Sequence, residues 1–151
     1  GPGGPPSVIL AVGDSPGPPD PEAERRGRRR DGSPLALASR VYAVDAATGL
    51  PTGWDFAPPA YARQAAAGDA FPFKLCMPHA WSSPAVGGDG AVYLGHMSGQ
   101  LFAIRDADGD GVLRGAEVSA YPGGRGYRGS PGLAPGLLVA TPCDGMHVFE
   151  A

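Results

Sequence analysis

The sequence predicts an all-β protein built from short antiparallel strands. Glycine and proline account for 25 and 18 of the 151 residues, and many of them separate short apolar runs. Apolar runs of strand length between turn residues are typical of an all-β fold. The clearest case is residues 82–106, SSPAVGGDGAVYLGHMSGQLFAIRD, where the turn signals GGDG and MSGQ separate three predicted strands.

The N-terminal part alternates between an apolar run and polar, proline-rich segments. We expect residues 1–6, GPGGPP, to be flexible, because proline lacks an N–H group and glycine costs backbone entropy. SVILAV predicts a first strand within residues 7–14. Residues 15–34 carry almost no large apolar side chain, which predicts a disordered Pro/Arg-rich insertion.

The remaining residues divide into three ranges. Residues 35–81 resume strand character and continue in a long loop, in which YARQAAAG (61–68) favours about two helical turns. Residues 82–121 form the best-defined unit and contain an acidic loop at 106–117. Residues 122–151 repeat the pattern of short strands and turns.

These ranges are related by internal repeats. The segment AVYLGHMSGQLFAI aligns with LLVATPCDGMHVFE, with Gly99 over Gly145, and SRVYAVDAATG aligns with GQLFAIRDADG. The units recur about every 45–60 residues, a period that marks β-propellers, in which each blade is a four-stranded sheet. We therefore predict a partial β-propeller of about three incomplete antiparallel blades with long loops.

The segment SSPAVGGDGAVYLGHMSGQLFAI resembles the quinoprotein-type (PQQ-like) propeller repeat. Residues 41–54, VYAVDAATGLPTGW, match the later half of that repeat, with Thr48 and Gly49 at its Thr-Gly turn and Trp54 one residue later than its tryptophan. The resemblance covers most of residues 35–151 and implies a propeller fold. It implies no activity, because the repeat pattern is structural.

The chain departs from this repeat after the strand at residues 101–104, where DADGDGVLRGAE replaces the expected Thr-Gly turn. Its spacing is that of an EF-hand-type calcium loop, in which alternate carboxylates converge on one ion and a glycine at the sixth position permits a sharp turn. We expect Leu113 to anchor the loop to a neighbouring core. The predicted calcium ligands are Asp106, Asp108, Asp110, the carbonyl of Val112, and Glu117.

The flanks of this loop favour a structural ion over a sensor. A paired calcium sensor needs amphipathic helices on both sides of the loop. The upstream residues alternate as a strand, and the downstream AEVSAY lasts at most two turns before Pro122. The alternative to metal binding is an acidic, solvated turn, because such turns are also rich in Asp and Gly.

Two Cys/His clusters leave several interpretations open. Cys76 and His79 form one cluster, and Cys143 and His147 form the other. Together they are compatible with a tetrahedral zinc site, with a Cys76–Cys143 disulfide, or with two unremarkable thiols. A disulfide implies an oxidising compartment, such as an organelle lumen or an extracytoplasmic space.

Charge and hydropathy limit the partners. The net charge of −3 indicates no global polyanion partner, and no run approaches the roughly 20 apolar residues of a transmembrane helix. The run Arg25–Arg30 is compatible with peripheral contact to an anionic membrane or an acidic partner, or with a solvated loop. No aromatic residues interleave it, so nucleic-acid binding is not expected.

No catalytic residues emerge from the sequence. Quinone-dependent dehydrogenases of the resembled family use a calcium ion, an Asp base and usually a vicinal cysteine pair, none of which maps onto this chain. The three histidines show no nucleophilic triad pattern. We therefore expect a non-catalytic scaffold or interaction module, part of a larger propeller or assembly of other protein subunits. The alternatives are a fragment of a PQQ-dependent dehydrogenase and a calcium-regulated adaptor.

Overall fold

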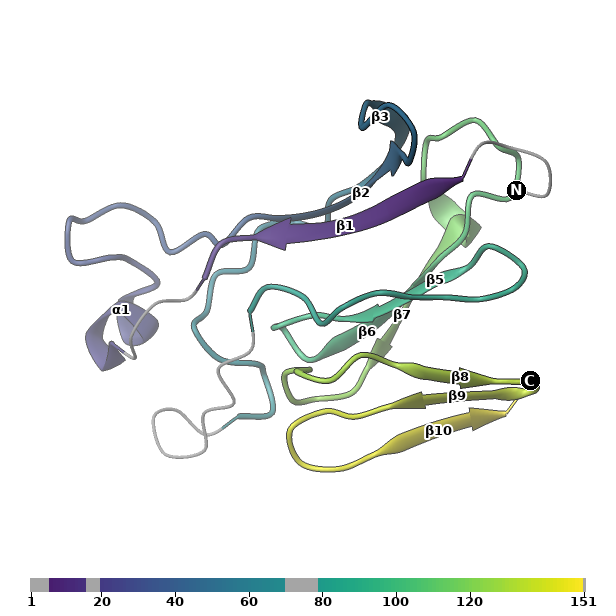
Figure 1. Ribbon diagram of the computed structural model, residues 1–151. Coiled ribbons are helices and arrows are strands. Elements are labelled where there is room, and N and C mark those ends of the chain that lie inside the picture. Colours follow the sequence, from purple (N-terminus) through teal and green to yellow (C-terminus); the bar gives the residue numbers. More distant parts are fainter. Residues whose placement is uncertain (1–5, 16–19, 70–78, 151) are drawn as a thin grey trace.

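The described strands form three antiparallel sheets that lie one above another in the computed structural model (Figure 1). The structure describes residues 6–15, 20–69 and 79–150. The all-β prediction is confirmed, and none of the three sheets closes on itself. Sheet 1 contains β1 (Ser7–Gly13), β2 (Ser39–Asp45) and β3 (Pro51–Phe56). Sheet 2 contains β4 (Ala85–Val86), β5 (Val92–Gly95), β6 (Gln100–Ile104) and β7 (Val118–Pro122). Sheet 3 contains β8 (Gly132–Ala134), β9 (Leu137–Ala140) and β10 (His147–Glu150).

The main core lies between sheets 1 and 2. Side chains alternate between the two faces of a strand, so each sheet turns every second residue toward this core. Leu94 and Ile104 from sheet 2 and Val41 from sheet 1 are completely buried there. Around them pack further apolar side chains of both sheets and of the loops, among them Ile9, Ala11, Phe56, Trp81, Val92 and Phe102.

A smaller cluster joins sheet 2 to sheet 3. It centres on Tyr127, which is fully buried together with Leu101 and Ala140. The Tyr127 side chain lies directly against the backbone of Gly95 and of Gly123, where a Cβ atom would overlap it. Glycine at these two positions therefore permits the close approach of sheets 2 and 3.

The strand registers reveal the internal repeat, with one correction. Leu94 pairs with Phe102 in sheet 2, and Ala140, which aligns with Leu94, pairs with His147 in sheet 3. The sequence alignment placed Val148, not His147, over Phe102, so it is wrong by one residue in β10. The shift turns Phe149 toward the cluster of Tyr127 and leaves Val148 on the open face. Burial of the larger side chain explains this register.

The segment predicted to be disordered over residues 15–34 contains a short helix, α1 (Pro21–Arg26). The side chain of Asp20 accepts hydrogen bonds from the backbone N–H groups of Glu22 and Ala23, and Gly27 ends the helix in the left-handed conformation. These caps satisfy helix-end groups that would otherwise lack partners. A segment with almost no large apolar side chains can therefore still form a short helix when both of its ends are capped.

The helical turns predicted over residues 61–68 do not form. Tyr61 instead exchanges two backbone hydrogen bonds with Leu37, at 2.8 and 2.9 Å. The Gln64 side chain accepts a hydrogen bond from the Asp20 backbone N–H at 2.9 Å, and Gly68 N–H donates to the Gly124 carbonyl at 2.6 Å. These long-range contacts outweigh the helix propensity of the segment.

A buried histidine links sheets 1 and 2 through polar contacts. The Nε2 atom of His96 lies 3.0 Å from the Ser39 hydroxyl of β2, and its Nδ1 atom lies 2.8 Å from the Ser98 hydroxyl. Its ring also packs on Trp81, with 4.5 Å between ring centroids. Burial disfavours the charged imidazolium and lowers the pKa of His96 to about 4.

This burial makes stability depend on pH. The folded-state pKa of about 4 lies below the ordinary value of 6.5, so the unfolded chain binds the proton more tightly between these values. The contribution of neutral His96 is complete above pH 6.5 and is lost as the pH falls toward 4. We expect the free energy of unfolding, measured in urea, to drop by about 2 kcal/mol between about pH 7.5 and about pH 5 through this residue.

The variant His96→Gln provides the control, because glutamine keeps hydrogen-bonding capacity but does not titrate. Its unfolding free energy should vary less across the same pH range than that of the parent protein. An equal pH dependence in both proteins would assign the effect to other groups.

Candidate metal site

The acidic loop Asp106–Glu117 connects β6 to β7 within a hairpin of sheet 2. Arg105 N–H donates to the Glu117 carbonyl at 2.8 Å, and the next pair, Ile104 and Val118, continues the antiparallel ladder. A 3-10 helix of three residues, Gly115–Glu117, precedes β7. Strands therefore flank the loop on both sides, apart from this single turn.

Three of the predicted ligands come together at the base of the loop. One carboxylate oxygen each from Asp106, Asp108 and Glu117 lies within 4.8 Å of the others. Calcium–oxygen distances are about 2.3–2.6 Å, so two ligands of the same ion lie up to about 5 Å apart. The spacing of these three carboxylates is compatible with a single cation between them.

Backbone amides hold these carboxylates in place. Asp106 accepts hydrogen bonds from Gly109 N–H at 2.7 Å and from Gly111 N–H at 3.0 Å. Glu117 accepts from Ala107 N–H at 2.9 Å and from Arg114 N–H at 3.2 Å. These amides lower the pKa of Glu117, with Ala107 as the largest cause, so its carboxylate is ionised and able to bind a cation.

Asp110, also a predicted ligand, does not belong to this group of three carboxylates. Its side chain accepts a hydrogen bond from Val112 N–H at 2.7 Å and forms an ion pair with Arg114 at 2.8 Å. The Val112 amide, followed by Arg114, lowers the pKa of Asp110. Val112, whose carbonyl is the remaining predicted ligand, forms an isolated parallel β-bridge with Asp55 of β3.

The loop also contacts sheet 1. Leu113 packs against the core shared by sheets 1 and 2, which confirms its predicted role as an anchor. Gly111, at φ +78°, lies so close to β3 that a Cβ atom there would be 3.2 Å from the Gly53 carbonyl oxygen. The sequence held no signal for these contacts to β3, because they join residues far apart in the chain.

The predicted Cys/His clusters are only partly described. Cys143 takes part in a disulfide, so it is not available as a zinc-binding thiolate. Cys76 lies outside the described residues. His79 is exposed, whereas His147 lies in β10 with its ring 5.4 Å from that of Tyr121. The position of His147 is that of a packing residue at the contact of sheets 2 and 3.

The basic run Arg25–Arg30 is largely paired with neighbouring groups. Arg25 and Arg26 both form ion pairs with Glu22, and Arg30 pairs with Asp20 at 2.8 Å. Arg28 donates to the Gly32 carbonyl at 2.8 Å. These contacts reduce the free positive charge of the run. Within the described part of the chain, no helix is long and apolar enough to cross a membrane.

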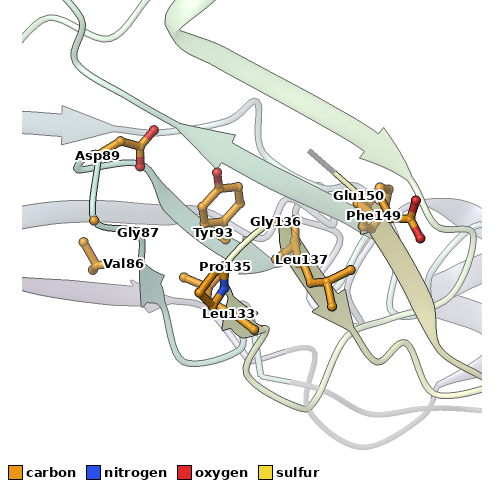
Figure 2. Close-up of a pocket in the computed structure, with 13 residues that line it drawn as sticks. Val86, Gly87, Asp89, Tyr93, Leu133, Pro135, Gly136, Leu137, Phe149 and Glu150 are labelled. Atoms are coloured by element: carbon orange, nitrogen blue, oxygen red, sulfur yellow. The ribbon is translucent and has the colours of Figure 1, made fainter.

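A cleft of about 650 Å³ opens between sheets 2 and 3. Figure 2 shows Tyr93 near its middle, with Asp89 toward one end and Glu150 toward the other. Apolar side chains of sheet 3, including Leu133 and Leu138, line the remainder. No constellation of a nucleophile and a base lines this cleft, so its shape alone supports no reaction.

Comparison with known proteins adds no further assignment: no protein-family description matches the chain, and no curated protein is similar to it.

The hydrogen bonds of Glu117 generate a prediction about the loop without metal. Replacing Glu117 with alanine removes the acceptors of the Ala107 and Arg114 amides, so both amides should exchange hydrogen faster. Hydrogen exchange in a metal-chelating buffer measures this effect. Glu150→Ala, which removes an exposed carboxylate on β10, serves as the control and should leave both amides unchanged. Equal exchange in all three proteins would show that Glu117 does not hold the loop.

Proposed function

We propose that this chain is a non-catalytic β-propeller scaffold or interaction module in which the loop Asp106–Glu117 binds a structural calcium ion. One observation carries the proposal: the loop that gathers three carboxylates also packs against sheet 1 through Leu113 and Val112. An ion in this loop would fix a contact between two sheets. That role is one of architecture rather than chemistry.

The arrangement of the sheets supports the propeller part of the proposal. Sheet 2 has four strands in simple up-and-down order, β4-β5-β6-β7, as a propeller blade does. Sheets 1 and 3 pack on its two faces and each contain three strands. The resemblance of residues 35–151 to the PQQ-like repeat points the same way.

The donor set supports calcium over softer metals. All the candidate side-chain donors are carboxylate oxygens, which suit hard cations, and calcium accepts six to eight such ligands in flexible geometry. Asp110 and the Val112 carbonyl would add to Asp106, Asp108 and Glu117, provided that Asp110 exchanges its ion pair with Arg114 for the metal.

The flanks of the loop support a structural ion over a regulatory one. Calcium sensors respond by changing the angle between two helices. Here β6 and β7 are paired along their whole length, from Gln100 with Pro122 to Ile104 with Val118. The pairing leaves no helix pair to open. The disulfide at Cys143 supports an oxidising compartment, such as an organelle lumen or an extracytoplasmic space.

Calcium binding should raise stability without changing shape. Binding to the folded state alone stabilises it by about 2.7 kcal/mol when the free ion is at 100 times its dissociation constant. We expect the melting temperature of metal-free protein to rise on addition of calcium and to fall again with chelator. Small-angle scattering should give the same radius of gyration in both states.

Two variants and a control make this test specific. Asp108→Asn and Glu117→Gln each remove a carboxylate from the group of three and should abolish the calcium-dependent rise in melting temperature. Asp31→Asn, in an exposed turn distant in sequence from the loop, should keep it. An unchanged melting temperature in the parent protein would refute calcium binding, and a large change in scattering would favour a regulatory ion.

A further inference from the structure

The three sheets stack face to face in the same orientation, and this stacking leaves one apolar face open at each end. For each sheet, we call the face that points in the direction from sheet 1 toward sheet 3 its forward face, and the opposite face its rear face. The forward face of sheet 1 meets the rear face of sheet 2, and the forward face of sheet 2 meets the rear face of sheet 3. Among the described residues, nothing covers the rear face of sheet 1 or the forward face of sheet 3.

The rear face of sheet 1 carries the residue types that are buried in sheet 2. Leu10 lies opposite Tyr42, as Leu94 lies opposite Phe102. Val8 lies opposite Val44, as Val92 lies opposite Ile104. All four residues of sheet 2 are at most 5% exposed, whereas Val8 is 46% exposed. The same pattern is thus covered in one sheet and open in the other.

The forward face of sheet 3 is also apolar and open. Val139 pairs with Val148, and Leu137 pairs with Glu150, so their side chains share the face opposite Leu138 and Phe149. Val148 is 51% exposed and Leu137 is 41% exposed. Exposed apolar patches of this kind on a sheet mark interaction surfaces.

We propose that a second copy of this chain covers both faces, with the forward face of sheet 3 in one copy against the rear face of sheet 1 in the other. The inference rests on the proposed scaffold function and names its partner. Inside the chain a rear face always meets a forward face, so the two open faces are the two halves of a contact that the chain already makes twice. Two copies contain six sheets, within the range of about four to eight blades that close a propeller.

The test uses one charged substitution on each face. Val8→Glu blocks the rear face, Val148→Glu blocks the forward face, and Leu50→Glu alters a residue that is 65% exposed in the turn after β2. In analytical ultracentrifugation, the parent chain and Leu50→Glu should sediment with twice the monomer mass of 15.3 kDa. Each face variant alone should be monomeric.

Mixing the two face variants gives the decisive measurement. The intact forward face of Val8→Glu can meet the intact rear face of Val148→Glu, so the mixture should contain a dimer that neither variant forms alone. This mixed dimer keeps one of the two contacts and should therefore dissociate at least tenfold more readily than the parent dimer. Val12→Glu and Val139→Glu, on the same two faces, replace the first pair if either of those variants fails to unfold cooperatively.

Three results would overturn the proposal. They are a parent chain that is monomeric at about 100 μM, a dimer that persists in one face variant alone, and a mixture that stays monomeric. A monomer that calcium still stabilises would reject only the second copy as partner. A dimer indifferent to calcium would reject only the structural ion.

Discussion

The structure depends on the central strands of sheet 2, β5 and β6, being covered on both faces. A strand exposes alternate residues to opposite sides, so a middle sheet must be apolar at nearly every position. β5 and most of β6 meet this requirement: Val92, Leu94 and Ile104 pack toward sheet 1, while Leu101 packs toward Tyr127 and sheet 3. The hairpin turns, the acidic loop and the two outer sheets are all positioned by this central sheet.

Sheets 1 and 2 are joined by three kinds of contact with different physical origins. The apolar core is non-directional, whereas the contact of His96 with Ser39 depends on hydrogen-bond geometry and on a neutral imidazole. The acidic loop adds a third contact, in which Leu113 reaches the core while the carboxylates stay near solvent. Without a cation, backbone amides that donate to Asp106 and Glu117 offset part of the mutual repulsion of these carboxylates.

The sequence predicted the features that depend mainly on residues close together in the chain, namely the central strands and the spacing of the carboxylates. The alternation in AVYLG and QLFAI predicted β5 and β6, and the spacing of Asp106, Asp108 and Glu117 indicated the carboxylates that the fold brings together. The contact of the loop with β3 and the failure of residues 61–68 to form a helix depend on partners distant in the chain. Helix α1 was predictable from Asp20, Pro21 and Gly27, whose capping pattern was present in the sequence.

The hairpin ends of sheets 1 and 2 differ greatly in length and yet close with the same bond. Asp45 N–H donates to the Leu50 carbonyl at 2.9 Å around residues 46–49, and Arg105 N–H donates to the Glu117 carbonyl at 2.8 Å around residues 106–116. Loop-closure entropy grows only slowly with length, so the fold tolerates either connection. This end of the hairpin can therefore carry either a short turn or the long acidic loop while the sheet beneath it keeps its pairing.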